Sequence, residues 1–283
     1  MKRLIITGDD FGLAVPVNEA IEIAHRSGVL STTSLMVGAG AATDAIERAR
    51  RLPTLKVGLH LVLVNGHPLL PAHLIPGLVD QHGEFHENLL AAGFRFFFRP
   101  EVRRQLEAEI HAQFAAFHDT GLPLDHVNSH NHMHLHPTIL SLILKVGRSF
   151  GLSAIRLPYE PPVPSWRASR KGLIGKVASA LGLAPWTWLL KARLRSAGIK
   201  ANDFIFGLHD TGAMNEATVL RLLAELPEGV TEMYFHPATR RCREIDRSMA
   251  DYCHEEELAA LTSAKVRAAL ENMHLQPVGF RDL

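Results

Sequence analysis

The chain has 283 residues, of which 47% are hydrophobic, and its 30 Lys and Arg residues nearly balance 29 Asp and Glu residues. Such a chain can bury a full core in one large α/β domain or in two smaller ones, and its near-neutral charge argues against nucleic acid as a partner. Two cysteines are too few for a disulfide framework, and the short apolar run near the N-terminus predicts neither a signal peptide nor a membrane span. We therefore expect a cytoplasmic protein with reduced thiols, whose 17 histidines raise the question of a bound metal.

Predicted strands alternate with segments of helical periodicity. Strands are predicted, in chain order, at residues 4–7, 32–37, 55–63, 124–128, 154–157, 204–206 and 232–235. Apolar residues with a period of about 3.6 predict helices over 17–24, 42–49 and 102–117. This alternation is typical of a parallel sheet and favours a single β/α barrel similar to a TIM barrel, although a doubly wound open sheet gives nearly the same pattern.

Four of the predicted strands end in side chains suited to catalysis or metal binding. In parallel α/β folds the active site lies at the carboxyl ends of the strands. The first predicted strand ends at Asp9 and Asp10, and the third carries His60. The fourth runs into a histidine-rich segment that begins at His130, and the last ends at His236. Any one of these residues could be a helix cap, a core histidine or part of a polar turn, but their joint position at one edge of the sheet indicates a functional site.

Two imidazoles and one carboxylate are a sufficient ligand set for a divalent metal ion, with positions left for water and substrate. Adjacent residues on a strand point to opposite faces, so Asp9 and Asp10 can share such a site only where the strand ends, and Gly12 permits a turn there. One aspartate could then bind the metal while the other transfers protons, and the spacing allows either order. A mixed Asp and His site admits Mg²⁺, Mn²⁺, Co²⁺ or Zn²⁺.

Four motifs together resemble the YdjC-like, or ChbG-like, carbohydrate deacetylases: T-G-D-D-F-G at 7–12, G-L-H at 58–60, N-S-H-N-H-M-H at 128–134 and Y-F-H-P at 234–237. The resemblance spans residues 4–237, and within the family the sequence is most similar to the hopanoid-biosynthesis-associated branch called HpnK. It implies a NodB-related, deformed parallel β/α barrel. It also implies an enzyme that hydrolyses the N-acetyl group of an amino sugar with one divalent metal ion, Mg²⁺ in the family.

The same resemblance implies roles for individual residues. Asp9 matches the proton acceptor, and His236 matches the imidazole that serves as general acid. Arg156 falls where relatives often place a basic residue near this acid and base. The implied metal ligands are Asp10, His60 and His130.

The histidine-rich segment places His130, His132, His134 and His136 at a period of two. On an extended chain this period puts all four side chains on one side, and we expect Pro137 to begin the following helix. Not all four imidazoles can bind one ion. His132 and His134 could instead orient a ligand through a hydrogen bond, or replace His130 as the ligand if the chain turns more tightly.

The strongest change in composition lies at 161–202, which contains many basic residues, no acidic residue and all three tryptophans, Trp166, Trp186 and Trp188. This basic segment could be a lid or insertion whose tryptophans pack inward. It could equally be an amphipathic surface that contacts anionic lipid at the inner membrane face. The second reading suits a lipid-linked amino sugar, and the HpnK resemblance implies a hopanoid that carries N-acetylglucosamine in ether linkage. His209 also follows a predicted strand, where we expect it to shape the rim of the pocket.

Three classes of function remain open from the sequence. The first is an N-deacetylase, acting on a lipid-linked sugar or on soluble chitooligosaccharides such as diacetylchitobiose. The second is a metal-dependent phosphoesterase, which usually requires two metal ions and more carboxylates than this sequence offers. The third is a non-catalytic binding module stabilised by a metal ion with four protein ligands. The oligomeric state stays open, a homodimer included, and we expect the other histidines, among them His126 and His254, to be ordinary surface or turn residues.

Overall fold

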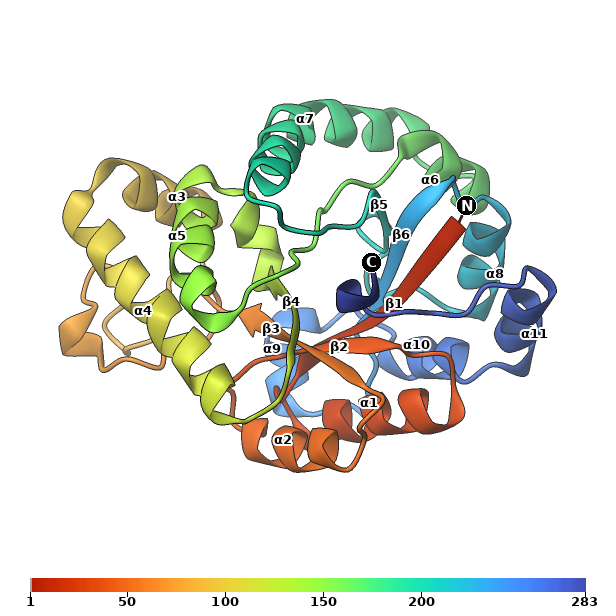
Figure 1. Cartoon of the computed structure of the whole chain (residues 1–283), viewed down its shortest axis with the longest axis horizontal. Coiled ribbons are helices and arrows are strands. Elements are labelled where there is room, and N and C mark those ends of the chain that lie inside the picture. Colours follow the sequence, from red (N-terminus) through yellow and green to blue (C-terminus); the bar gives the residue numbers. More distant parts are fainter. Residues whose placement is uncertain (1) are drawn as a thin grey trace.

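A parallel sheet of six strands runs through the centre of the computed structural model, which describes residues 2–283 (Figure 1). The strands are β1 (Lys2–Phe11), β2 (Thr32–Leu35), β3 (Lys56–Leu61), β4 (Leu124–Ser129), β5 (Phe204–Phe206) and β6 (Gly229–Phe235). They lie in the order β4-β3-β2-β1-β6-β5, so that β1 is central and pairs with β2 and β6. Strands and helices form a half-barrel, which confirms the predicted barrel-like α/β fold.

Helices surround the strands of this half-barrel (Figure 1). The α-helices are α1 (Val15–Ser27), α2 (Ala42–Arg50), α3 (Leu89–Phe98), α4 (Pro100–Asp119), α5 (Pro137–Gly147), α6 (Pro162–Ser169), α7 (Leu173–Ser196), α8 (Glu216–Ala224), α9 (Arg243–Met249), α10 (His254–Leu261) and α11 (Ala264–Asn272). The 3-10 helices are η1 (Ala72–Leu74), η2 (His130–Leu135), η3 (Arg148–Phe150) and η4 (Phe280–Asp282). The three predicted helices correspond to α1, α2 and α4, and Pro137 begins α5 as predicted.

The first strand and helix show how the apolar pattern produces this architecture. Nearly all of β1 is buried, as expected for a central strand of a parallel sheet with both faces covered. α1 turns its apolar stripe inward, and the buried residues of that stripe are Val17, Ala20, Ile21 and Ala24. A Cβ atom on Gly8 would lie 2.1 Å from Ile21 Cδ1, so the missing side chain of Gly8 lets α1 pack directly against β1.

The predicted strand at 154–157 is wrong as a regular strand. This segment forms only isolated bridges, to β4 and to Lys200. The backbone of Leu157 pairs with a side chain instead, because its N–H donates to Asn202 Oδ1 (2.7 Å) and its C=O accepts from Asn202 Nδ2 (2.8 Å). Pro158 then has no N–H to donate. The segment is an irregular connection that is hydrogen-bonded to β4 on one side and to Lys200 and Asn202, which precede β5, on the other.

The basic segment 161–202 folds into α6 and α7 on the outside of the half-barrel (Figure 1). α7 packs inward through Leu190 and Leu194, and Arg193 Nη1 donates to Ser141 Oγ on α5 (2.7 Å). Within residues 2–283, α7 alone is long and apolar enough to cross a membrane, by length and composition only. In its most apolar 18-residue stretch, 17% of the residues are buried. Core helices of globular proteins pass the same test, so this finding is weak evidence for a span.

Two histidines that we expected at the surface, His126 and His254, are buried. The ring of His126 stacks on Phe280 of η4, with centroids 4.3 Å apart. Beside it on β4, Asp125 accepts hydrogen bonds from the backbone N–H groups of Phe280 (3.1 Å) and Arg281 (3.0 Å). Asp125 Oδ2 also lies 3.0 Å from His126 Nδ1. These contacts fix the C-terminal 3-10 helix against β4.

Candidate active site

β1 bends at its carboxyl end, and the bend brings two adjacent carboxylates into the interior. Asp10 has a φ of 63°, in the left-handed region that few residues other than glycine adopt. The N–H of Leu13 donates to the carbonyl of Asp10 (2.9 Å) and closes the turn. Asp9 and Asp10 are both buried. The predicted turn is therefore present, but it begins at Asp10, before Gly12.

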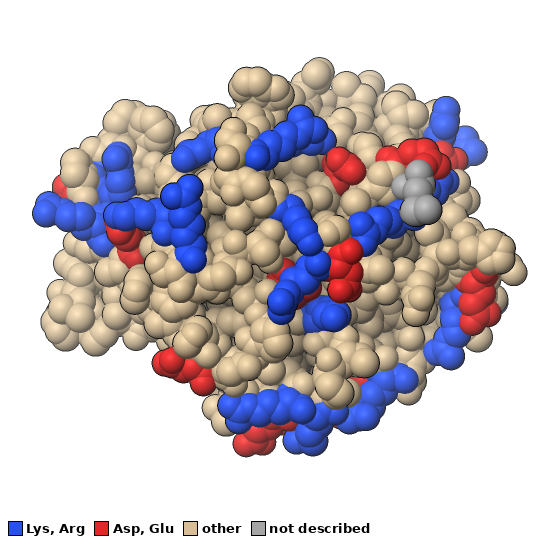
Figure 2. Space-filling model, in the orientation of Figure 1, with Lys and Arg blue, Asp and Glu red and all other residues tan. Residues whose placement is uncertain are grey.

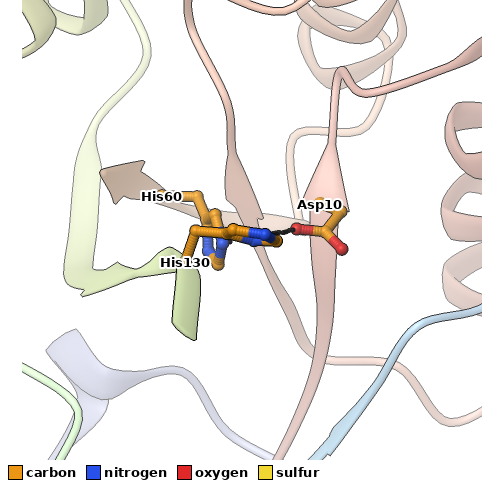
Figure 3. A group of neighbouring side chains, drawn as sticks. All are labelled: Asp10, His60 and His130. Carbon is orange, nitrogen blue, oxygen red and sulfur yellow. Dashed lines mark ion pairs between the residues drawn. The ribbon is translucent and has the colours of Figure 1, made fainter. Parts of the chain in front are cut away.

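Asp10, His60 and His130 converge from the carboxyl ends of β1, β3 and β4, and we call these three residues the metal group (Figure 3). One ligand atom of each lies within 4.8 Å of the other two. Asp10 Oδ1 lies 3.3 Å from His60 Nε2 and 3.5 Å from His130 Nδ1. Both Asp10 oxygens and His60 Nε2 are buried and have no hydrogen-bond partner. Because buried polar atoms without partners are costly, the group fits a divalent cation that would supply the missing contacts.

Hydrogen bonds behind His60 present its Nε2 atom to the metal group. Asn128 Nδ2 donates to Asp9 Oδ1 (3.0 Å), which leaves Asn128 Oδ1 to accept from His60 Nδ1–H (2.9 Å). Ser34 Oγ donates to the same Asp9 oxygen (2.8 Å). With its proton on Nδ1, the His60 ring has a free lone pair on Nε2. Burial lowers the pKa of His60 to about 4, so the ring is neutral near pH 7, as metal binding requires.

The other two members of the metal group influence each other's charge. Burial alone would raise the pKa of Asp10, but His130 and His60 lower it far below its ordinary range. Burial alone would lower the pKa of His130, but Asp10 raises it above its ordinary value. Asp10 is therefore a carboxylate at neutral pH, and a cation that binds here competes with a proton for the His130 ring.

Asp9 forms a buried, two-pronged ion pair with Arg156 beside the metal group. Arg156 Nη1 donates to Asp9 Oδ2 (2.6 Å), and Nη2 donates to Asp9 Oδ1 (2.9 Å). Burial alone would raise the pKa of Asp9, but Arg156 and then His60 hold it well below its ordinary range. Asp9 is thus ionised and able to accept a proton, although so low a pKa makes it a weak base.

Glu232 on β6, which the sequence did not single out, holds the other side of Arg156. Its carboxylate accepts hydrogen bonds from Arg156 Nε (3.0 Å) and Nη2 (2.7 Å) and from Thr7 Oγ1 (2.6 Å). The guanidinium also lies over the Tyr234 ring, 4.8 Å from its centroid. Two carboxylates therefore fix one arginine, and the arginine fixes Asp9. The only sequence feature that could have pointed to a role for Glu232 is its carboxylate inside an otherwise apolar strand.

His236 follows β6 and lies close enough to Asp9 and Asp10 to affect their charge. It lowers the pKa of each aspartate, but less than the nearer charged groups do. Its backbone N–H donates to the buried carboxylate of Glu257 (2.6 Å), and its carbonyl lies 2.6 Å from His254 Nδ1. The ring packs against two tyrosines, and its Nδ1 atom is buried without a partner. The backbone of His236 is thus fixed, while its ring has a nitrogen that no protein atom uses.

The predicted extended conformation of the histidine-rich segment is wrong. Asn131 and His132 have φ angles of 53° and 52° inside η2, and this left-handed turn breaks the period of two. His134 Nδ1 lies 2.7 Å from Ser129 Oγ, and its Nε2 lies 3.1 Å from a backbone carbonyl, so both ring nitrogens have partners within the protein. Of the four histidines at 130, 132, 134 and 136, only His130 joins the metal group.

The residues predicted to contact substrate or form a lid lie outside the metal group. Trp186 and Trp188 are exposed on α7, and Trp166 on α6 is half-buried. His209 follows β5 and lines a small cavity of about 180 Å³ against α7. A larger cavity of about 520 Å³ lies at the carboxyl edge of the sheet, lined by residues that follow β1, β2 and β3, among them Leu13, Met36, Val62 and Asn65. Its size is within the range of small-molecule sites.

Comparisons with known proteins identify the family. Residues 3–272 match the family model described as YdjC-like protein. A carbohydrate deacetylase of Brevibacillus brevis is 37% identical over 99% of this chain and 99% of its own. A chitooligosaccharide deacetylase of Serratia marcescens is 30% identical over 100% of this chain and 99% of its own. A solved structure from Enterococcus faecalis, 27% identical, superposes with a TM-score of 0.75 over 99% of this chain and 98% of that one. The chain therefore belongs to the YdjC-like protein family.

Proposed function

We propose that this protein hydrolyses the N-acetyl group of an N-acetylated amino sugar with one divalent metal ion at the metal group. The observation that carries the proposal is the buried set of Asp10, His60 and His130, in which both Asp10 oxygens and His60 Nε2 lack partners, next to the Asp9 carboxylate that Arg156 holds. Similarity to proteins named carbohydrate deacetylase and chitooligosaccharide deacetylase supports the same reaction class, hydrolysis of a linear amide bond.

The donor set of the metal group fits several ions. One carboxylate and two imidazoles accept Mg²⁺, Mn²⁺, Co²⁺ or Zn²⁺, and the family resemblance favours Mg²⁺. When bound, the ion supplies Lewis acidity, which polarises the acetamide carbonyl and lowers the pKa of water toward about 7 in the most favourable cases. Three protein ligands leave room for water and substrate.

Two residues beside the metal group each carry out one proton transfer. Asp9 accepts a proton from the attacking water, whose oxygen adds to the acetamide carbonyl carbon. Arg156 and Glu232 hold Asp9 in position for this transfer. His236 donates a proton to the sugar nitrogen as the C–N bond breaks, which yields acetate and a free amino sugar. The low pKa of Asp9 lets it release its proton before the next turnover.

We further propose that the sugar is lipid-linked, as in the HpnK branch that the motifs resemble, and that the enzyme works from the cytoplasm at the inner membrane face. The basic segment 161–202 supports this, because it has no acidic residue and exposes Trp186 and Trp188. The name of the Serratia marcescens relative favours the alternative, a soluble chitooligosaccharide.

Acetate release distinguishes these substrates. The protein is incubated with diacetylchitobiose and with lipid-linked N-acetylglucosamine, each with and without a metal chelator. We expect release from the lipid-linked sugar at least about tenfold faster in kcat/KM, and loss of both activities with chelator. Release from the soluble sugar alone would exclude the lipid-linked substrate, and no release from either would refute deacetylation.

Two other classes of function fit the structure less well. A phosphoesterase usually uses two ions about 3.5–4 Å apart, whereas the part of the chain that the structure describes contains one group of potential ligands. A structural metal site usually has four protein ligands, and the metal group has three.

A further inference from the structure

α3 exposes an unusually apolar surface. Its exposed side chains, which we call the α3 patch, are Leu89, Leu90, Phe94, Phe97 and Phe98. Leu90 is 80% exposed, and Phe94 and Phe98 are each 66% exposed. The rings of Phe94 and Phe98 stack with centroids 5.8 Å apart, and those of Phe97 and Phe98 are 4.9 Å apart. Contiguous apolar surface of this kind on a folded protein usually marks an interaction site.

The helix that carries the α3 patch is firmly attached to the protein. Asn88 caps its N-terminus by accepting a hydrogen bond from the N–H of Ala91 (3.0 Å). On the inner side Phe96 is buried, and its ring meets His136 at the N-terminus of α5 edge to face. The exposed phenylalanines therefore belong to the outer face of a packed helix.

Arginines are frequent in and directly after the part of the chain that forms the α3 patch. Between residues 94 and 104 the chain has four arginines, Arg95, Arg99, Arg103 and Arg104, and only one acidic residue, Glu101. Figure 2 shows Lys and Arg side chains gathered on the side of the molecule that carries α3, α4 and α5. A cluster of exposed aromatic residues bordered by arginines is suited to an interface that is apolar at depth and anionic at its surface.

The α3 patch is connected to the candidate active site through α5. α5 packs against both α3 and α7, and η2, whose first residue is His130, packs against α5 and α7. The second exposed apolar surface, on α7, includes Ile174, Leu181 and Trp188. The two helices that carry these apolar surfaces both pack against α5, which in turn packs against the segment that supplies a ligand of the metal group.

We infer that the α3 patch seats this protein on an anionic lipid bilayer. A second copy of the chain fits less well, because a twofold contact through this patch would bring the two arginine clusters together. The five side chains of the α3 patch together expose only roughly 550 Å², below the ~800 Å² per partner of a stable dimer. The idea that this contact delivers a lipid-linked sugar to the metal group rests on the proposed function. The binding of the α3 patch to lipid is independent of that function.

Vesicle co-sedimentation tests the inference with the full chain and no substrate. We expect the wild type to bind vesicles of phosphatidylcholine with phosphatidylglycerol at least about tenfold more tightly than vesicles of phosphatidylcholine alone, and high salt to weaken binding. Phe94→Ser with Phe98→Ser should reduce binding at least about tenfold. The matched control, Ile23→Ser with Leu74→Ser, removes exposed apolar residues elsewhere and should bind like the wild type. Arg99→Gln with Arg104→Gln should remove most of the preference for anionic vesicles.

Three outcomes would overturn the inference: no binding of the wild type to anionic vesicles, equal binding by the Phe94→Ser, Phe98→Ser variant, or a dimer in sedimentation velocity that this variant dissociates. Acetate release from diacetylchitobiose in the absence of vesicles should be the same for the wild type and the variant. If no sugar is deacetylated but the vesicle results hold, the proposed function fails and the lipid contact stands.

Discussion

Replacing Glu232 with glutamine would remove one of the two carboxylates that hold Arg156 while keeping the size of the side chain. Glu232 accepts two hydrogen bonds from Arg156 and one from Thr7, and all three side chains are buried. Glutamine has a single acceptor oxygen, so at least one bond from the guanidinium is lost and the new amide N–H₂ faces another donor. Hydrogen bonds to charged groups are worth about 1.5–3 kcal/mol, so we expect the free energy of unfolding to fall by about 2–4 kcal/mol.

The same substitution should lower kcat and leave metal binding unchanged. Arg156 would lose an orienting contact and would hold Asp9 less precisely, and a misplacement of about 1 Å costs about 10²-fold in rate. Glu232 has no hydrogen bond to any member of the metal group, so metal affinity should stay within about twofold of the wild type. Urea unfolding followed by circular dichroism, calorimetric metal titration and acetate release measure the three quantities.

Thr7→Val is the matched control, because it removes one hydrogen bond to Glu232 and keeps its charge. We expect it to cost about 1 kcal/mol in unfolding free energy and little in kcat. If Glu232→Gln unfolded like the wild type and retained its kcat, Glu232 would not position Arg156. If metal affinity fell as far as kcat, the substitution would have disrupted the whole site instead.

Three further substitutions have separate readouts. Asp9→Asn should keep the metal bound and lower kcat by about 10³-fold, and normal acetate release would contradict its role in proton transfer. His60→Ala should weaken metal binding in calorimetry by at least about 100-fold and abolish turnover, whereas the exposed His73→Ala should change neither. Burial opposes ionisation of Asp125, but His126 and two backbone N–H groups hold its pKa below the ordinary value. The ionised Asp125 therefore stabilises the folded protein above the unfolded pKa of about 3.9, and this contribution is lost as pH falls through the folded pKa. Asp125→Asn should lower the urea midpoint at neutral pH and approach the wild type once the pH is below the folded pKa, and an equal deficit at neutral and at strongly acidic pH would refute this linkage.

The barrel-like fold and the edge of the sheet that carries the metal group could be predicted from local patterns, whereas the choice of Asp10 and His130 as ligands came from the family resemblance. Parallel strands buried on both faces are almost entirely apolar, so Asp10 and His60 stand out at the ends of β1 and β3. The carboxyl ends of parallel strands meet at one edge of the sheet, and this rule places His130 and His236 beside them. No local pattern, however, shows that Asp10 itself adopts a positive φ.

The features that could not be predicted depend on contacts between residues distant in the sequence. The segment 154–157 has the composition of a strand, but Asn202, 45 residues beyond Leu157, takes its hydrogen bonds. Glu232 is a single carboxylate in an apolar run, and its role follows only from Arg156, 76 residues earlier.

The prediction for the histidine-rich segment was wrong because of the local backbone conformation, which the composition does not reveal. A period of two is meaningful only on an extended chain, and Asn131 and His132 both adopt the left-handed conformation. Asparagine and histidine are among the residues that tolerate this region better than most, so the same sequence is compatible with a strand and with a tight turn. The turn leaves His130 in the metal group and gives His134 partners elsewhere.

The proposed requirement for one metal ion at Asp10, His60 and His130 is tested most directly by measuring metal content and acetate release on the same sample. Metal per chain is counted by mass spectrometry before chelation, after chelation and during stepwise return of the ion. We predict one ion per chain in the active protein, loss of acetate release with the ion, and recovery in proportion to its return. Undiminished acetate release from protein without metal, or activity that requires two ions per chain, would contradict the proposed site.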